Sequence, residues 1–350
     1  MRRGYLALAR AGFAAMAAVS AALAAGPAAA QTPIRVAVEG SLTGPAAPLV
    51  AAQDRGYYRT EKLDVSIDAT GGAPDAITRV ATGAAEFALA DINMVIKYRD
   101  QNPGAPLKAV FMVYNKPPYA VIARKSRGIA NPKDLEGKRI GAPATDAAGS
   151  QWPLFAKLNN IDASKVKVES IAPAVREPML AAGQVDAVTG ISFSTYLNLK
   201  ERGVPVDDLV VLAMADYGVQ LYGDAIVMNT KFALESPEAV RAFLRAYLAG
   251  LKTTIREPAR AVDSVVKRNE VANKNLELER LRMAIHDNIL TEEVQANGLG
   301  GVDPARLAKA IDQLSETHKF RSKPEPSEVF DPTYLPPEPE RRVGPRARPG

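Results

Sequence analysis

The sequence lacks cysteine altogether and contains only two histidines and one tryptophan among its 350 residues. Without cysteine, the chain has no disulfide, no thiolate metal site, no cysteine nucleophile and no lipid-modified N-terminal cysteine. Glycine-rich nucleotide-binding loops and His-Glu-x-x-His metal motifs are also missing. The two histidines, His286 and His318, fall in stretches of helical periodicity, away from the predicted loops. We therefore expect a protein that is not an enzyme, with no catalytic residue, no metal site and no cofactor.

A long hydrophobic stretch is absent beyond the N-terminus. There, three arginines precede an alanine-rich apolar run at residues 11–25, and a small-residue sequence ends at Ala30. This pattern predicts a secretory signal peptide over residues 1–30, cleaved near Ala30, because the run is too short to span a bilayer. The Arg2-Arg3 pair leaves open whether export follows the general secretory or the twin-arginine route. Either route carries the mature protein out of the cytoplasm.

The chain has no strong excess of positive or negative charge once residues 1–30 are removed. Residues 1–30 contain three arginines and no acidic residue, so their cleavage lowers the formal net charge from +5 to +2. Nothing in this balance favours a nucleic-acid partner. The remaining arginine cluster, Arg341, Arg342, Arg346 and Arg348, lies in a proline-rich tail that we expect to be disordered, with Phe330, Tyr334 and Leu335 as candidates to hold its first half on the body.

The chain contains an internal repeat of a helix followed by an apolar strand. In the first copy, Pro74 opens a helix, Gly83 ends it, and the apolar run 87–90 suits a buried parallel strand. The second copy, at 177–188, has the same order of a proline, a glycine stop, an acidic residue and an apolar strand. Strands upstream of each copy also pair by position. The sequence therefore predicts two α/β lobes that face each other as a clamshell, with a ligand cleft between them.

Proline and glycine mark where the chain passes between the lobes. Asn115 to Pro118 holds two successive prolines, and the stretch 216–224 is rich in glycine and tyrosine, so we place the two inter-lobe crossings there. The predicted organisation is lobe 1 (first part) at 31–116, lobe 2 at 117–217, a mainly helical second part of lobe 1 at 218–322, and a proline-rich tail at 323–350.

Two predicted helix starts in lobe 2 carry candidate ligand contacts. Thr145, Asp146 and Ser150 precede or open a helix whose free N–H groups suit an anion or a carbonyl group, although the same side chains also suit helix caps. Arg176 falls near the next helix start, where its planar fork would suit a carboxylate or a sulfonate. The alternative for Arg176 is a solvated surface arginine.

Four motifs in fixed order resemble the periplasmic solute-binding proteins of ABC importers, in the branch that handles sulfonates, taurine, nitrate and pyrimidine precursors of thiamine. They are Gly56-Tyr-Tyr58 before Leu63, Gly83-Ala-Ala-Glu-Phe87 with Ala90-Asp91, Pro132-Lys-Asp-Leu-Glu-Gly137, and Ala182-Gly-Gln-Val-Asp186. The resemblance implies a type II-like, two-lobed periplasmic binding protein fold. It implies a periplasmic monomer that closes on a small molecule and delivers it to an ABC permease, with no nucleic-acid partner.

The resemblance, applied loop by loop, also implies a set of ligand-binding residues: Ser41, Thr43, Gly72, Asp91, Asn93, Tyr114, Thr145, Ser150, Trp152, Arg176, Ser192, Phe193 and Tyr217. Arg176 favours an organic acid or sulfonate as ligand. Asp91, Asp146 and Asp216 suit a pyrimidine precursor that donates N–H groups, and this is the second ligand class that we consider.

Two other functions remain open at the level of sequence. A ligand-sensing subunit for a membrane receptor would need the same fold and the same cleft. A fungal branch of the superfamily makes the thiamine pyrimidine as an enzyme, using a cysteine-rich segment and an active-site histidine. This chain has no such segment, and its histidines lie elsewhere.

Overall fold

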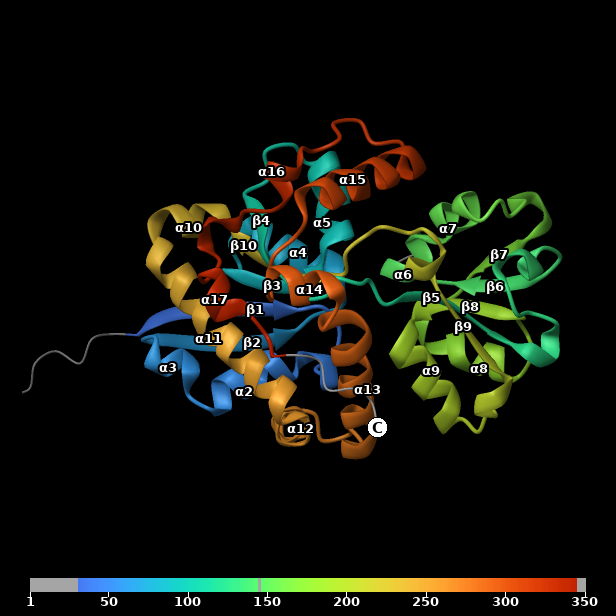
Figure 1. Cartoon of the computed structure of the whole chain (residues 1–350), viewed down its shortest axis with the longest axis horizontal. Helices are drawn as coiled ribbons and strands as arrows, with labels where there is room; N and C mark the ends of the chain where they lie inside the picture. The colour runs from blue at the N-terminus through green and yellow to red at the C-terminus, as the bar shows by residue number, and fades with distance from the viewer. Residues whose placement is uncertain (1–30, 144–145, 345–350) are drawn as a thin grey trace, which may run out of the picture.

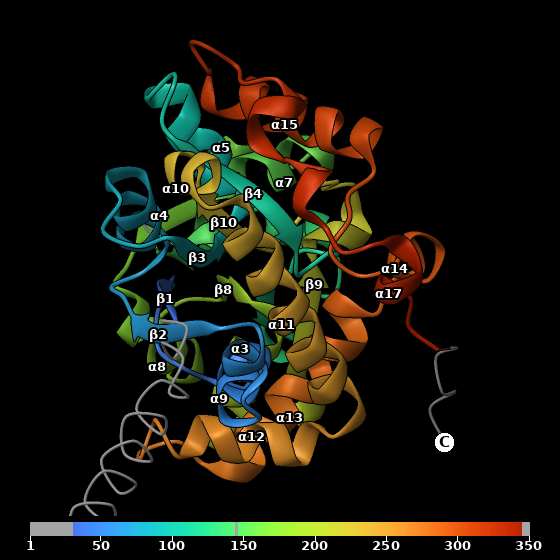
Figure 2. The same ribbon diagram turned by 90° about the vertical axis from the view of Figure 1, so that its left-hand side faces the viewer.

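The computed structural model of the chain describes residues 31–143 and 146–344. Two five-stranded sheets, each packed against helices, form two lobes that lie side by side (Figure 1). The view at right angles shows helices on either side of the first sheet (Figure 2). The predicted signal peptide at 1–30 and Thr145 lie outside the described residues. Within the described part of the chain, no helix combines the length and the apolar character needed to cross a bilayer.

The sheet of lobe 1 has the strand order β2-β1-β3-β10-β4. Its strands are β1 (Thr32–Val38), β2 (Leu63–Ala69), β3 (Phe87–Asp91), β4 (Leu107–Met112) and β10 (Asp224–Asn229). β1 runs parallel to β2 and β3, whereas β10 is antiparallel to β3 and β4. All five residues of β3 are buried, as expected for a central strand with helices on both faces.

The sheet of lobe 2 repeats this plan with the order β7-β6-β8-β5-β9. Its strands are β5 (Tyr119–Arg124), β6 (Arg139–Ala142), β7 (Lys167–Ser170), β8 (Ala187–Ile191) and β9 (Leu209–Ala213). The repeated helix–strand unit corresponds to α4 (Ala73–Thr82) with β3 in lobe 1 and to α8 (Arg176–Ala181) with β8 in lobe 2. The two-lobed α/β architecture that the repeat predicts is therefore confirmed.

The helices divide unequally between the lobes. Lobe 2 has α6 (Ala147–Ser150), α7 (Trp152–Leu158), α8 and α9 (Ser192–Glu201); lobe 1 has α2 (Ala47–Asp54), α3 (Tyr57–Thr60), α4, α5 (Ile92–Gln101), α10 (Thr230–Glu235), α11 (Pro237–Arg256), α12 (Pro258–Val266), α13 (Lys274–Ala284), α14 (Glu292–Asn297), α15 (Pro304–His318), α16 (Pro326–Val329) and α17 (Glu338–Arg341). In α11, the apolar side chains at helical spacing are buried, and Phe243 stacks on Phe87 of β3 with ring centroids 4.1 Å apart.

Two segments cross between the lobes, as predicted. The first joins β4 to β5, and the second joins β9 to β10. Arg306 of α15 holds both segments, because its guanidinium donates to the backbone oxygens of Asn115 and Leu221 at 2.6 Å each. It also pairs with Glu293 at 2.7 Å and lies over the ring of Tyr222, 4.1 Å from its centroid. The side chain of Arg306, in lobe 1, thus holds together the two segments that connect the lobes.

The first half of the C-terminal tail lies on lobe 1, where its apolar residues were expected to hold it. Phe330 is buried and forms a β-bridge to Ala109 in the edge strand β4, and Tyr334 and Leu335 pack against the core. The guanidinium of Arg341 donates to the backbone oxygens of Leu299 at 2.8 Å and Pro336 at 2.9 Å. The expectation of disorder is therefore wrong at Arg341, because these carbonyl contacts hold it on lobe 1. Arg346 and Arg348 lie outside the described residues.

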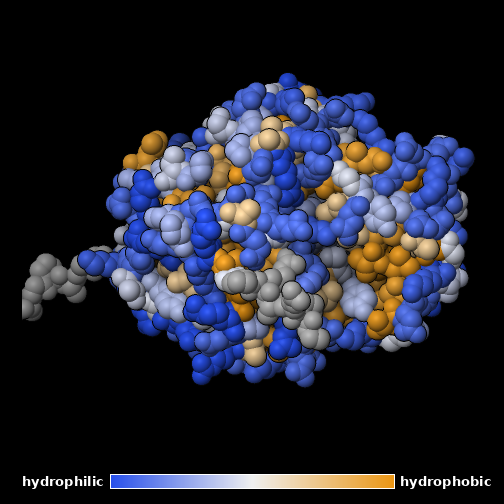
Figure 3. Space-filling view, viewed as in Figure 1, coloured by the Kyte–Doolittle hydropathy of each residue, from blue (hydrophilic) through white to orange (hydrophobic). Residues whose placement is uncertain are grey.

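The corresponding edge of lobe 2 differs from that of lobe 1. Figure 3 shows hydrophobic side chains gathered on the surface of lobe 2, where the edge strand β9 lies. Val206 and Val211, before and within this strand, are 44% and 38% exposed. The two lobes therefore share a topology, but the C-terminal tail covers the edge strand β4 of lobe 1, whereas the edge strand β9 of lobe 2 is partly exposed.

Candidate ligand-binding site

A small cavity of about 130 Å³ lies between the lobes. The residues that line it are Val38, Glu39, Ser41, Thr43, Pro45, Ala46, Leu89, Tyr114, Pro118, Ile191, Phe193, Ser194 and Asp224. They come from the carboxyl ends of β1, β3 and β8, from the loop after β1, from the first crossing, and from the starts of α9 and β10. This is the position at which open α/β sheets bind ligands, because the loops that leave parallel strands converge there.

The wall from lobe 1 is built by the loop after β1. Ser41 and Thr43 present hydroxyl groups, and Pro45 is the second residue of a short 3₁₀ turn at Gly44–Ala46 that leads into α2. Proline is tolerated in the first turn of a helix because its missing N–H would have no partner within the helix there. The loop therefore offers polar side chains to the cavity from a fixed backbone.

Three carboxyl groups gather at the floor of the cavity. Glu39 and Asp224 line it, while Asp91 is fully buried behind them. Glu39 accepts the backbone N–H of Asp91 at 2.8 Å. Asp91 caps α5 by accepting the N–H of Met94 at 2.9 Å, and it also accepts the hydroxyl of Tyr119. The floor is thus acidic and held by hydrogen bonds from both lobes.

These carboxyl groups keep their protons to unusually high pH. Burial and the neighbouring Asp91 raise the pKa of Asp224 to about 8. Burial, followed by the charges of Asp224 and Asp91, raises the pKa of Glu39 well above its ordinary value. Burial also raises the pKa of Asp91, although the hydrogen bond from Tyr119 opposes this shift. Near neutral pH, the cavity therefore offers the carboxylic O–H of Asp224 as a donor, together with carboxyl and carbonyl oxygens as acceptors.

Two aromatic rings close the cavity from opposite lobes. Tyr114 of the first crossing and Phe193 of α9 meet edge to face, with ring centroids 6.4 Å apart. Burial raises the pKa of Tyr114 well above its ordinary value, so its hydroxyl stays neutral. The pair offers a flat ligand one ring from each lobe.

The structure brings together four of the residues implied by the resemblance, since Ser41, Thr43, Tyr114 and Phe193 line the cavity. Asp91 and Asn93 lie directly behind it, where Asn93 donates to the hydroxyl of Tyr119 at 2.7 Å. The other described candidates lie outside the lining: Gly72 precedes α4, Ser192 starts α9, Ser150 donates to the backbone of Ala147, Trp152 packs on Phe155, and Tyr217 packs edge-on against Phe155.

Arg176 lies in a network of its own within lobe 2. Its guanidinium pairs with Asp146 at 2.6 Å and with Glu177 at 3.2 Å, and its side chain is only 13% exposed. Asp146 in turn caps α6 by accepting the N–H of Gly149 at 2.5 Å. The arginine is thus engaged by two carboxylates, and among the described residues that line the cavity there is no lysine or arginine.

Sequence reasoning passed over Glu39 and Asp224, the two carboxyl groups that line the cavity. Glu39 opens a loop from which the resemblance implies only the hydroxyl residues Ser41 and Thr43 as ligand contacts. Asp224 precedes the apolar run Ala225 to Met228, which is a strand signal that could have placed it at the end of a central strand. The spacing alone could not show that β10 runs antiparallel and brings Asp224 to the cleft.

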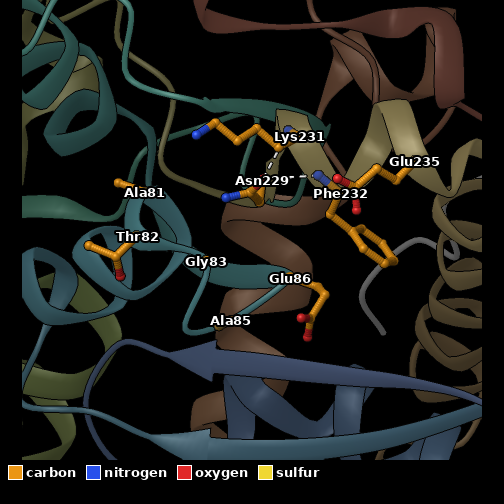
Figure 4. A pocket seen from close by; sticks show the side chains of 9 residues that line it. All are labelled: Ala81, Thr82, Gly83, Ala85, Glu86, Asn229, Lys231, Phe232 and Glu235. Atoms are coloured by element: carbon orange, nitrogen blue, oxygen red, sulfur yellow. Dashed lines mark hydrogen bonds between the residues drawn. The ribbon is translucent and has the colours of Figure 1, made fainter.

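A second pocket lies at the other end of the lobe 1 sheet, around Gly83, Glu86 and Asn229 (Figure 4). Asn229 ends β10 opposite to Asp224 and caps α10 by accepting the N–H groups of Lys231 and Phe232. Its Nδ2 donates to Val80 at 2.7 Å. Both ends of the Asn229 amide are thus hydrogen-bonded to the backbone. We therefore interpret this pocket as the place where β10, α4 and α10 meet, rather than as a second ligand cleft.

Comparison with known proteins identifies the family. Residues 45–261 match the family described as NMT1/THI5 like. The chain belongs to the NMT1/THI5-like family. This match covers most of both lobes, including α4–β3 and α8–β8, so the repeat that organises the sequence lies inside the region shared with the family.

Proteins similar in sequence to this NMT1/THI5-like chain include binding proteins and enzymes. It is 30% identical over 222 residues to the riboflavin-binding protein RibY of Chloroflexus aurantiacus, an alignment that covers 62% of this chain and 61% of that protein. It is 27% identical over 285 residues to the formylaminopyrimidine-binding protein of Halalkalibacterium halodurans, covering 79% and 82%. A 4-amino-5-hydroxymethyl-2-methylpyrimidine phosphate synthase of Schizosaccharomyces pombe is 25% identical, covering 60% and 62%.

Solved structures place the chain in the periplasmic binding protein fold. The alkanesulfonate-binding protein SsuA of Xanthomonas axonopodis pv. citri, bound to MOPS, matches with a TM-score of 0.65 at 16% identity, covering 87% of this chain and 99% of that one. The periplasmic nitrate-binding protein NrtA of Synechocystis matches with a TM-score of 0.62 at 12% identity, covering 87% of each chain. At these identities the likeness concerns the fold alone.

Proposed function

We propose that this protein is the binding component of an ABC importer, and that it captures a small heterocycle of the aminopyrimidine class between its lobes. The observation that carries this proposal is the acidic lining of the inter-lobe cavity, where Glu39 and Asp224 face the ligand space. The expected signal peptide and the periplasmic fold relatives support delivery to a permease from the periplasm.

The carboxyl groups match the edge of an aminopyrimidine. Such a ring presents an amino N–H donor beside a ring-nitrogen acceptor, and a protonated carboxyl presents a carbonyl acceptor beside an O–H donor. The pKa of Asp224, raised to about 8, supplies that protonated form near neutral pH, and burial shifts the pKa of Glu39 in the same direction. An anionic ligand would instead meet carboxyl groups that must stay fully protonated to avoid repulsion.

The expectation of an organic acid or sulfonate depended on Arg176, and its surroundings favour the other ligand class. Two carboxylates already hold its guanidinium inside lobe 2. Its Nε and Nη1 donate to Glu177 and Asp146, so an anion would meet a guanidinium whose charge two carboxylates already balance. This balance of charge weakens the case for an anion.

The size of the cavity supports a single ring. Ligand pockets for drug-sized molecules measure roughly 300–1,000 Å³, whereas this cavity measures about 130 Å³. Tyr114 and Phe193 lie nearly perpendicular to each other, so one of them would pack on a face and the other on an edge of a single ring. A fused three-ring ligand such as a flavin would require the lobes to separate further.

Binding rather than synthesis is supported by the placement of the histidines. His286 is exposed and paired with Asp287, and His318 ends α15 beside Phe320. Neither side chain belongs to the described lining of the cavity. The general acid–base group that a pyrimidine-forming enzyme would draw from histidine is therefore not near the proposed ligand.

The proposal is tested by native mass spectrometry on the exported protein, purified gently from cells grown in rich medium. We expect a bound molecule that leaves on denaturation and whose mass corresponds to an aminopyrimidine. A sulfonate or carboxylate recovered in stoichiometric amount would contradict the ligand class. An empty protein that also fails to bind any added pyrimidine would contradict the function.

A further inference from the structure

The lobes touch at a second place, directly behind the cavity. There, α13 of lobe 1 packs against α9 of lobe 2 (Figure 1). The first turn of α9 carries Phe193 and Ser194, which line the cavity. Asn198 lies four residues after Ser194, one turn further on the same face of the helix. A contact at Asn198 therefore acts on the same helix face that meets the ligand.

Arg280 of α13 makes that contact. Its guanidinium donates to Oδ1 of Asn198 at 3.0 Å and pairs with Glu277 on its own helix. The side chains of Arg280 and Glu277 are only 6% and 5% exposed. The pair is thus screened from water at the boundary between the lobes, where such a hydrogen bond is stronger than on the surface.

Glu277 extends the contact to the other wall of the cavity. Its Oε2 accepts the backbone N–H of Gly44 at 2.5 Å. Gly44 approaches α13 so closely that a Cβ at this position would lie 2.3 Å from the backbone oxygen of Glu277. The neighbours of Gly44 in the chain, Thr43 and Pro45, both line the cavity.

We propose that Arg280 is a positioning residue that joins the two walls of the ligand cavity across the lobes. Through Glu277 it holds the lobe 1 loop at Gly44, and through Asn198 it holds helix α9 of lobe 2. It does not touch the ligand. This inference rests on the proposed function for its effect on affinity, but the contact between the lobes stands independently of it. When the lobes separate, the bond from Arg280 to Asn198 breaks while the Glu277 pair stays with lobe 1.

A second polar pair at the same boundary provides a matched control. Lys200 of α9 pairs with Glu279 of α13 at 2.7 Å, and both side chains are more than 40% exposed. Exposed pairs contribute little because water and salt screen them. Lys200→Met therefore removes a lobe-to-lobe ion pair without disturbing the buried contact.

The experiment measures the dissociation rate of 4-amino-5-hydroxymethyl-2-methylpyrimidine from the wild type and from Asn198→Ala, Arg280→Met and Lys200→Met. Loss of one buried, charge-assisted hydrogen bond is expected to raise the dissociation rate about tenfold or more, with the association rate changed less than threefold. Lys200→Met is expected to stay within twofold of the wild type. Asn198→Ala keeps the buried ion pair, so it reports on the contact even if Arg280→Met folds poorly.

A ligand-free measurement separates this proposal from the proposed function. Because the chain has no cysteine, Leu234→Cys in lobe 1 and Val206→Cys in lobe 2 give two unique spin-label sites. Without ligand, Asn198→Ala should shift the population of label distances toward longer values, while Lys200→Met should not. Unchanged distances in Asn198→Ala and Arg280→Met would overturn the proposal. A clear shift combined with no pyrimidine binding would support the contact and contradict the proposed function.

Discussion

Asp91 and Asp224 lie directly opposite each other on the adjacent antiparallel strands β3 and β10, at the floor of the inter-lobe cavity. Like charges at opposed positions of a ladder destabilise a sheet when both are ionised. Burial is the larger effect, and together with the charge of Asp91 it raises the pKa of Asp224 to about 8. The ligand-free protein therefore stores a proton at the position where we expect a ligand to bind.

This arrangement predicts how stability changes with pH. The pKa of Asp224 is about 8 in the folded state and close to its ordinary value of 3.8 in the unfolded chain, so the folded state binds the extra proton between these values. The free energy of unfolding should fall as pH rises from 4 to 8, by at most about 1.4 kcal/mol per pH unit for this group. Asp224→Asn should flatten that dependence, as measured by urea denaturation at several pH values.

The exposed Asp64 on β2 offers the matched control for this experiment. Asp64→Asn should leave the slope of stability against pH as in the wild type. If Asp224→Asn and Asp64→Asn show the same slope, Asp224 does not hold a proton in the folded state, and the description of the cavity floor is wrong.

Glu39→Met should weaken aminopyrimidine binding about tenfold to a hundredfold, because a thioether offers neither the carbonyl acceptor nor the O–H donor of the carboxyl. Methionine is close to glutamate in size, so the cavity should keep its shape. Isothermal titration calorimetry measures the affinity. Glu86→Met, in the carboxyl that pairs with Arg35 outside the cleft, is the control and should bind as the wild type does.

Arg176→Met should lower stability rather than remove a ligand contact. The substitution leaves Asp146 and Glu177 without their cation, so we expect a loss of about 2–4 kcal/mol in the free energy of unfolding. Arg79→Met, which breaks an exposed pair with Asp75, should cost less than about 1 kcal/mol. If Arg176→Met is as stable as the wild type but no longer binds ligand, the prediction is wrong and Arg176 is a ligand contact.

Arg306→Met should loosen the pivot between the lobes. It removes the charge-assisted hydrogen bonds to Asn115 and Leu221, at a cost of about 2–4 kcal/mol. Arg241→Met is a matched control, because Arg241 also lies over a tyrosine ring and donates to a backbone oxygen, but away from the crossings. The distance distribution between labels on the two lobes should broaden in Arg306→Met only. Equal broadening in both variants would contradict the role of Arg306.

Much of the fold follows from the sequence because the helix–strand unit occurs twice with its own start and stop signals. Pro74 and Gly83 bound α4 in the first copy, and the same logic marks α8 in the second. The strand β10 could not be predicted in this way. It enters the sheet after the chain returns from lobe 2, and its own residues do not indicate which strands it pairs with. Its place between β3 and β4 is decided by packing over long distances in the chain.

The candidate site was predictable in location but less so in chemistry. Loops at the ends of repeated strands point to a shared cleft, and Thr43 and Phe193 lie there. The partners of a charged side chain depend on tertiary contacts, so the sequence could not show that Arg176 is held by Asp146 or that Asp224 faces Asp91. These tertiary contacts are the reason that we favour a ligand with N–H donors, whereas the sequence alone favours an anion.

One measurement tests the central claim most directly: calorimetric titration of the purified protein with 4-amino-5-hydroxymethyl-2-methylpyrimidine and, separately, with taurine at pH 7. The acidic cavity predicts saturable binding of the pyrimidine, weakened by Glu39→Met, and no measurable binding of taurine. Tight binding of taurine that is insensitive to Glu39→Met, with no heat from the pyrimidine, would contradict the account.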